Sequence, residues 1–176
     1  MIIGVDLGST NVRSIIFDLN GQIHGQAYRT LKVCSPTPGF AEESPEAIWK
    51  ATLETLKESI KTSKLSPDAF RMVSFSSQMH GTIMIAQDGT LLSKLYTWLD
   101  RRAETQTLPL RNSIDPYELY SRTGCPLLFS YPLVKILWAK QNLPNRFSQC
   151  YKFLSAKGYV IYRMLGEYYI DRSIAS

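Results

Sequence analysis

The fold is decided near the N-terminus, by the stretch Ile2-Ile3-Gly4-Val5-Asp6-Leu7-Gly8-Ser9-Thr10-Asn11. Residues 2–6 are apolar and rich in β-branched side chains, which predicts a strand that ends at a carboxylate. A polar turn follows, and residues 12–18 predict a second strand. Asn20-Gly21 favours a hairpin with a type I′ turn, because that turn needs positive φ at both central residues. With a third strand over 22–31, the chain is expected to open as an antiparallel meander.

A helix of about 16 residues is expected next, because Ser44 is a typical N-cap and Pro45 suits the first helical position. The spacing of Trp49, Leu53, Leu56 and Ile60 predicts its apolar stripe. The remaining pattern predicts strands over 70–76, 83–86 and 94–99 and helices over 103–111, 116–122, 132–142 and 156–165. Asp115 and Ser155 are the expected caps and Gly166 the expected C-terminal glycine. A meander, a helix and further strands predict an α/β domain with a mixed sheet covered by helices.

The composition is that of an ordinary folded domain: 176 residues, of which 44% are hydrophobic and 20% charged. It excludes disordered, collagen-like and low-complexity classes. No window holds 18 uninterrupted apolar residues, and Asp6 follows Met1 too closely for a signal peptide, so neither a membrane partner nor secretion is expected. Cys34, Cys125 and Cys150 form no CxxC pair and are interpreted as reduced thiols in the cytoplasm. The net charge of +5 comes from scattered residues, which favours a solvated surface over nucleic-acid binding.

The turn after the first strand could bind phosphate. Gly8 permits a close backbone approach, Ser9 and Thr10 add hydroxyls beside successive N–H groups, and Asp6 could hold Mg²⁺ directly or through water. A hairpin turn with a capping Asp explains the motif equally well. A two-metal nuclease would need a further carboxylate after the strand over 70–76, and the stretch Ser74-Phe75-Ser76-Ser77-Gln78 supplies none.

Two further segments follow predicted strands, at the edge where α/β sheets usually bind ligands. In the first, Gln78 and His80 are neutral donors and acceptors suited to hydroxyl-rich ligands, although a lone His is often structural. In the second, Trp98 could face the C–H surface of a sugar, Asp100 could accept from hydroxyls, and Arg101 could pair with a carboxylate or phosphate. The alternative for the second segment is a core Trp before an ordinary charged helix start.

Taken in order, the motifs of the whole chain resemble the N-terminal part of the FGGY family of carbohydrate kinases, within the actin and hexokinase-like (ribonuclease H-like) superfamily. The resemblance lies in Gly4-Val5-Asp6-Leu7-Gly8-Ser9-Thr10, Pro38-Gly39-Phe40-Ala41-Glu42-Glu43, Ser77-Gln78-Met79-His80-Gly81, Trp98-Leu99-Asp100-Arg101-Arg102, Arg122-Thr123-Gly124-Cys125-Pro126, Pro132-Leu133-Val134-Lys135-Ile136 and Asp171-Arg172-Ser173-Ile174-Ala175-Ser176.

The resemblance implies a cytoplasmic enzyme that transfers phosphate from Mg-ATP to a sugar and is compatible with a homodimer. It implies that Asp6 orients Mg²⁺ and that the phosphates face Gly8, Ser9, Thr10 and Arg13. The implied sugar site comprises Gln78, Met79, His80 and Gly81, with Trp98, Asp100 and Arg101 nearby.

The resemblance also implies that residues 1–176 are an incomplete first domain. The family's general base, a second phosphate loop and most of the adenine site lie beyond Ser176. The chain alone is therefore expected to be inactive and to expose apolar surface.

The substrate is expected to be gluconate, because the segments around Trp98, Thr123 and Lys135 are similar to those of gluconate kinases. Gln78-Met79-His80-Gly81 is closer to the D-xylulose kinases, which makes D-xylulose the alternative. A sugar-sensing module without catalysis is an alternative of another class. The polar loop Gln78-Met79-His80 argues against the polymerising, actin-like branch of the superfamily.

Overall fold

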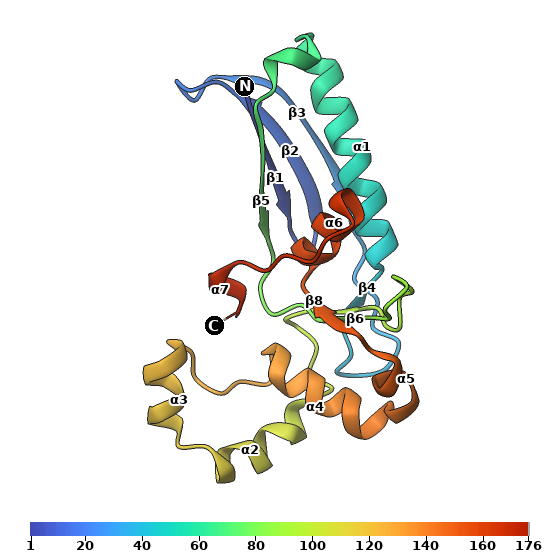
Figure 1. Cartoon of the computed structure of the whole chain (residues 1–176), viewed down its shortest axis with the longest axis vertical. Helices are drawn as coiled ribbons and strands as arrows, with labels where there is room; N and C mark the ends of the chain where they lie inside the picture. The colour runs from blue at the N-terminus through green and yellow to red at the C-terminus, as the bar shows by residue number, and fades with distance from the viewer. Residues whose placement is uncertain (176) are drawn as a thin grey trace.

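A four-stranded mixed sheet forms one half of the molecule (Figure 1). The computed structural model describes residues 1–175, except for the side chains of Ser173 and Ala175, so Ser176 of the last motif lies outside the described residues. The strand order is β3-β2-β1-β5, with β1 antiparallel to β2, β2 antiparallel to β3, and β1 parallel to β5. The bounds are β1 (Ile2–Leu7), β2 (Asn11–Phe17), β3 (Ile23–Thr30) and β5 (Met72–Ser77). The expected meander and mixed sheet are confirmed.

The hairpin between β2 and β3 is present, but the expected type I′ turn is wrong. Gly21 has φ 81, whereas Asn20 is not in the left-handed region. The N–H of Gly21 donates to the carbonyl of Asp18 at 3.1 Å, and the carboxylate of Asp18 accepts from the N–H groups of Asn20 and Gln22. Since Asp18 caps the turn and a bulge at Ile16/Phe17 shifts the register, only one residue needs a positive φ.

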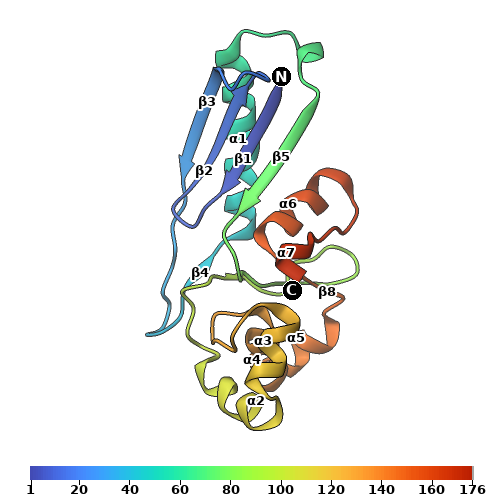
Figure 2. The ribbon, with the colours of Figure 1, turned by 90° about the vertical axis from the view of Figure 1, so that its left-hand side faces the viewer.

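Helix α1 (Pro45–Ser63) covers one face of the sheet, and Figure 2 shows it behind β1, β2 and β3. It begins where expected, with the hydroxyl of Ser44 accepting from the N–H of Ala47 at 3.3 Å. Its 19 residues exceed the expected 16, and Lys64 ends it with φ 56.

The buried face of α1 differs from the expected stripe. Trp49, Leu53, Leu56 and Ile60 are only partly buried, and the buried residues of α1 are Pro45, Ile48, Ala51, Thr52, Thr55 and Ser59. The cause is a close approach of helix and sheet: a Cβ on Gly25 would lie 2.4 Å from the carbonyl oxygen of Ser59. The hydroxyls of Ser14 and Ser59 are hydrogen-bonded at 2.9 Å across this contact. Small side chains therefore occupy the contact, and the larger apolar ones flank it.

The other half of the molecule contains short strand pairs and helices. β4 (Glu42–Glu43) pairs with β7 (Leu95–Tyr96), and β6 (Ile83–Ile85) pairs with β8 (Lys152–Leu154). The strands expected over 83–86 and 94–99 are thus shorter, and β4 and β8 were not expected. The remaining bounds are η1 (Pro67–Ala69), η2 (Glu104–Gln106), α2 (Thr107–Ser113), α3 (Pro116–Thr123), α4 (Pro132–Asn142), α5 (Pro144–Gln149), α6 (Ala156–Leu165) and α7 (Arg172–Ala175).

The expected helices agree well with these bounds. Asp115 and Ser155 cap α3 and α6, and Gly166 ends α6 with φ 73. The helix expected from 103 starts instead with the 3₁₀ turn η2 before α2. Helix α5 was not expected, and it follows α4 after a single residue, Leu143.

One apolar core lies between the sheet, α1 and α6. It contains Ile3, Val5 and Leu7 of β1 together with Val12, Ile16, Ile48, Ile83, Ile85, Leu95, Tyr159 and Val160. A smaller cluster of Ala103, Leu127 and Val134 supports the helical half. The opposite face of the sheet, turned toward the viewer in Figure 2, is covered by no helix of residues 1–175. Among residues 1–175, no helix is both long and apolar enough to cross a bilayer.

Candidate functional site

The carboxyl ends of the parallel strands β1 and β5 lie side by side. Asp6 is the register partner of Ser76, and the N–H of Gln78 donates to the carbonyl of Leu7 at 2.9 Å, which continues the pairing past the end of β5. The turn after Asp6 and the loop after Ser77 therefore begin at one edge of the sheet, where α/β sheets generally bind ligands.

Asp6 and Arg13 are cross-strand partners on the uncovered face. Both are exposed, and both line a hollow of about 530 Å³ together with Gly4, Phe17 and Ser76. Within residues 1–175, neither side chain has a hydrogen-bond or ion-pair partner. A carboxylate and a guanidinium are thus both available to a charged ligand at this edge.

The turn between β1 and β2 has the backbone of an anion site. The N–H of Gly8 donates to the carbonyl of Asn11 at 3.0 Å, while the N–H groups of Ser9 and Thr10 have no acceptor among the described residues. A Cβ on Gly8 would lie 3.1 Å from the carbonyl oxygen of Asn11 and 3.8 Å from Oδ2 of Asp6. A side chain at this position would therefore crowd the space between the turn and Asp6. Successive free N–H groups beside small side chains can bind phosphate oxygens.

Asp6 fits Mg²⁺ only as a single protein ligand. No group of three His, Cys, Asp or Glu that could hold a metal occurs in the part of the chain that the structure describes. Mg²⁺ in nucleotide sites commonly keeps several waters and takes one or two carboxylates plus phosphate oxygens. The residues present are therefore suited to a Mg-nucleotide and not to a metal held by protein alone.

The loop after β5 brings Met79 and His80 to a second cavity. This cavity, of about 330 Å³, lies between the loop, α3 and α4, and Leu119, Tyr131 and Ile136 are among its lining residues. The ring of His80 packs edge-on against Tyr131, with centroids 4.4 Å apart. Burial, and secondarily the charge of Lys135, lowers the pKa of His80, so its imidazole is neutral at pH 7. Neutral imidazole offers one donor and one acceptor to a ligand.

Gln78 is not free to turn toward a ligand, because its Nε2 donates to Oε2 of Glu43 at 2.7 Å. Glu43 is 2% exposed, and its burial raises the pKa of its carboxyl group to about 7 against the opposing effect of the Gln78 bond. Oε1 of each side chain is buried with no partner among the described residues. Glu43 was not among the site residues expected from the sequence. The available signal was a second acid beside Glu42, in a segment too short to be recognised as a strand.

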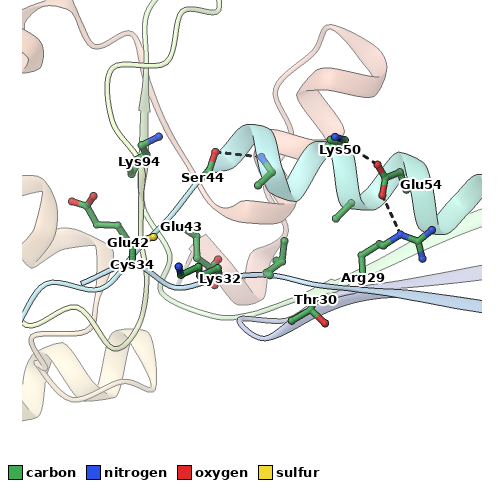
Figure 3. Close-up of a pocket in the computed structure, with 13 residues that line it drawn as sticks. Arg29, Thr30, Lys32, Cys34, Glu42, Glu43, Ser44, Lys50, Glu54 and Lys94 are labelled. Carbon is green, nitrogen blue, oxygen red and sulfur yellow. Dashed lines mark hydrogen bonds and ion pairs between the residues drawn. The ribbon is translucent and has the colours of Figure 1, made fainter. Parts of the chain in front are cut away.

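Glu43 also lines a cavity of about 460 Å³ between α1 and the chain that joins β3 to β4 (Figure 3). Exposed Lys32 and Lys94 line this cavity. Arg29 of β3 pairs with Glu54 of α1 at 3.0 Å, and Lys50 lies near Glu54 one turn away on the same helix. None of the site residues expected from the sequence lines this cavity.

Asp100 is fully buried, so it offers no exposed carboxylate to a sugar hydroxyl. Its Oδ2 accepts from the N–H of Ala41 at 2.7 Å, and its Oδ1 accepts from Nε of Arg102 at 2.8 Å. Arg102 also pairs with Glu42 at 2.6 Å and lies 3.8 Å over the ring of Tyr96. Asp100 therefore fixes the backbone around Ala41 and Arg102. In this structure its oxygens are used for these bonds and not for the contact with a sugar hydroxyl that was expected.

Trp98, Arg101 and Gly81 differ in their accessibility. Trp98 is 45% exposed. Arg101 is also exposed, and it pairs with Glu104 at 2.8 Å. Gly81 is buried, and a Cβ there would lie 2.7 Å from Cδ1 of Leu95, which indicates a packing role.

Lys135 belongs to the motif Pro132-Leu133-Val134-Lys135-Ile136 but was not expected at the site. It is fully buried in α4, and its Nζ donates to the carbonyl oxygens of His80 at 2.7 Å and Thr97 at 2.6 Å. Burial lowers its pKa to about 7, with Asp100 opposing and Arg102 reinforcing the shift. A lysine within the apolar helix over 132–142 was the signal that could have found it.

Known proteins share this architecture. The family model for the N-terminal domain of the FGGY family of carbohydrate kinases matches residues 1–176. The gluconokinase of Bacillus subtilis (strain 168) is 30% identical over 99% of this chain and 34% of its own length. The xylulose kinase of Staphylococcus xylosus is 26% identical over 99% of this chain and 36% of its own. The chain thus spans about a third of the length of the curated relatives it matches.

Solved structures agree with this assignment. The gluconate kinase from Lactobacillus acidophilus superposes with a TM-score of 0.88 at 31% identity, over 99% of this chain and 35% of that one. The xylulose kinase from Rhodospirillum rubrum reaches 0.92 at 24% identity, over 98% of this chain and 36% of that one, which is a likeness of fold. The expected α/β class is confirmed. The chain belongs to the FGGY family of carbohydrate kinases, in the N-terminal domain of that family.

Proposed function

We propose that this chain is the N-terminal part of a cytoplasmic sugar kinase that moves the γ-phosphoryl group of Mg-ATP to a hydroxyl of an open-chain sugar or sugar acid. The observation that carries the proposal is the shared edge of β1 and β5. There, the unpartnered Asp6 and the open turn at Ser9 and Thr10 lie beside the loop that bears Met79 and His80. Phosphoryl transfer chiefly requires that donor and acceptor be positioned and that the phosphate charge be neutralised.

Each group has a role that its surroundings allow. The N–H groups of Ser9 and Thr10 and the guanidinium of Arg13 bind phosphate oxygens, and Asp6 orients the magnesium ion through its water shell. Bound Mg²⁺ supplies positive charge that offsets the charge of the phosphates. Neutral His80 exchanges hydrogen bonds with sugar hydroxyls, and Met79 with the exposed Trp98 contacts C–H surface.

Gluconate is the proposed acceptor and D-xylulose the alternative. Relatives named for each sugar match at 26% to 30% identity. Arg101 supports gluconate, because its exposed guanidinium, three residues after Trp98 in the chain, could bind the carboxylate of a sugar acid in exchange for Glu104.

We further propose that residues 1–176 form only part of the first domain of the complete protein. The general base, which would accept the proton of the attacking hydroxyl, and most of the adenine site would then follow Ser176.

The test is ADP release by the complete protein with Mg-ATP and gluconate, D-xylulose or no sugar. Sugar-dependent ADP release with a preference for gluconate is expected. A preference for D-xylulose would show that the proposed acceptor is wrong and that the proposed kinase activity is right. Saturable sugar binding without ADP release would favour the sensing module over the enzyme.

A further inference from the structure

Lys135 occupies an unusual environment for a lysine. Its side chain has no exposed surface, and its Nζ lies 2.7 Å from the carbonyl oxygen of His80, 2.6 Å from that of Thr97 and 3.5 Å from that of Tyr96. Among the described residues, no carboxylate lies within ion-pair distance of it. Removing such a group from water costs free energy unless its N–H groups find acceptors, and here the acceptors are backbone carbonyls.

The two short bonds reach two separate segments of the chain. His80 belongs to the loop after β5, and Thr97 directly precedes Trp98. Lys135 lies 55 residues beyond the first and 38 residues beyond the second. It comes from α4, an element of regular backbone, whereas both carbonyls come from irregular chain. One amine thus ties two loops to a single helix.

The loop at His80 needs such support. His80 has φ 59, a left-handed conformation that is uncommon for a residue with a side chain, costs free energy and persists only where the surrounding structure imposes it. The bond from Lys135 is made to the carbonyl of this same residue. It therefore fixes the strained peptide from which the imidazole projects.

We infer that Lys135 is a positioning residue, which holds the loop at Met79 and His80 and the segment at Trp98 at a fixed separation before the acceptor binds. The inference rests on the proposed function. Lys135 itself touches no substrate in this role. Side chains held in place beforehand lose less conformational freedom when the ligand binds, so the benefit falls on acceptor affinity.

The first experiment compares Lys135→Met with Lys140→Met in the complete protein. Lys140 lies on the same helix and is exposed, so it controls for loss of a positive charge from α4. Lys135→Met is expected to raise the KM for the sugar on the order of ten- to a hundredfold, as expected for loss of hydrogen bonds from a charged donor. The KM for ATP is expected to stay within about twofold. An equal rise in both KM values, or no rise in either, would overturn the inference.

The second experiment is hydrogen–deuterium exchange of the complete protein without substrate. Exchange in Lys135→Met is expected to accelerate on the order of tenfold in both segments, 79–82 and 96–99, and Lys140→Met is expected to leave both unchanged. Acceleration in only one segment, or in neither, would contradict a shared anchor. If the unaltered protein phosphorylates no sugar, the proposed function fails and this experiment still decides the role of Lys135.

Lys135→Gln carries both measurements if Lys135→Met does not fold. Its amide keeps two N–H donors on a shorter side chain. A smaller rise in the KM for the sugar and a smaller acceleration of exchange in segments 79–82 and 96–99 are expected. Exchange that accelerates evenly over the whole molecule would overturn the inference.

Discussion

Glu43 and Gln78 are joined side chain to side chain at 2.7 Å although 35 residues separate them, and Gln78 is the donor. The bond links β4 to the first residue after β5. Its acceptor is a carboxylate that is almost wholly removed from water. The orientation of Gln78 is thus determined by a residue outside its own loop.

Stability should depend on pH through Glu43. Its pKa is raised from 4.5 to about 7 in the folded protein, so the folded state keeps a proton that the unfolded chain releases between these values. The resulting stabilisation is fully present below pH 4.5 and is lost as the pH rises through 7. In the unaltered protein, this loss should lower the free energy of unfolding by about 2 to 3 kcal/mol between pH 5 and pH 8, and Glu43→Gln should remove that decrease. Urea denaturation at both pH values measures it.

Glu118→Gln is the control for that comparison, because Glu118 is exposed on α3. Its pH dependence should match that of the unaltered protein. If Glu43→Gln matches it as well, Glu43 is ionised at neutral pH and the account of its burial is wrong.

In the complete protein, Asp6→Asn should abolish turnover and spare sugar binding. The amide keeps the shape of the side chain but loses the charge that would orient Mg²⁺, so kcat should fall on the order of a hundredfold or more. Coupled ADP detection and calorimetric titration with the sugar measure the two effects. Asp68→Asn, at the exposed turn η1, is the control. Retained turnover in Asp6→Asn would refute the role of Asp6.

Arg102→Lys should destabilise the protein far more than Arg101→Lys. The Arg102 guanidinium is 3% exposed and bonds both Asp100 and Glu42, and an ammonium cannot reproduce that planar set of donors. The expected loss is about 2 to 4 kcal/mol, since Asp100 would remain buried without its full complement of partners. Arg101 makes one exposed ion pair, so its loss should stay below about 0.5 kcal/mol. Similar thermal shifts for both variants would contradict this contrast.

Gly25→Ala should test the close contact between α1 and β3. Its Cβ would lie 2.4 Å from the carbonyl oxygen of Ser59 and 3.0 Å from the amide nitrogen of Ser63, and backbone atoms cannot rotate away. A loss of about 2 to 3 kcal/mol is expected in chemical denaturation. Gln26→Ala, at the exposed neighbouring position, should change stability by less than about 0.5 kcal/mol. A neutral Gly25→Ala would show that the helix can move outward at little cost.

The 176-residue chain by itself should not phosphorylate sugar. Among the residues that line the cavities at Asp6 and at His80, Asp6 is the one carboxylate, and no Asp or Glu in the described part of the chain lines the cavity at His80 as a general base would. ADP release by the purified chain with gluconate or D-xylulose, above a control without sugar, would contradict this prediction.

Local signals predicted the regular elements well. Ser44, Asp115, Ser155 and Gly166 act at helix ends as expected, because capping depends on residues within one turn of the end. The two-residue strand β4 could not be predicted, because its conformation depends on pairing with β7 more than 50 residues later.

The candidate site also contains features that the sequence could predict and features that it could not. Asp6 and His80 could be found because each follows a strand in a short polar motif. The burial of Asp100 and the engagement of Gln78 could not, since each depends on a partner brought in by tertiary packing, Ala41 in one case and Glu43 in the other. Lys135 escaped notice for a related reason: its acceptors are carbonyl groups, which every residue carries and no sequence pattern marks.

The pairing of β6 with β8 has a consequence for how the chain is made. Ile83, Met84 and Ile85 are fully buried, yet their strand partner is synthesised about 70 residues later. At ribosomal speeds of about 5 to 20 residues per second, this apolar triplet awaits its partner for roughly 3 to 14 s. The sheet of β1, β2 and β3 with α1 can form in that interval from neighbouring segments. Until β8 emerges, this apolar triplet is thus exposed to aggregation and to capture by chaperones.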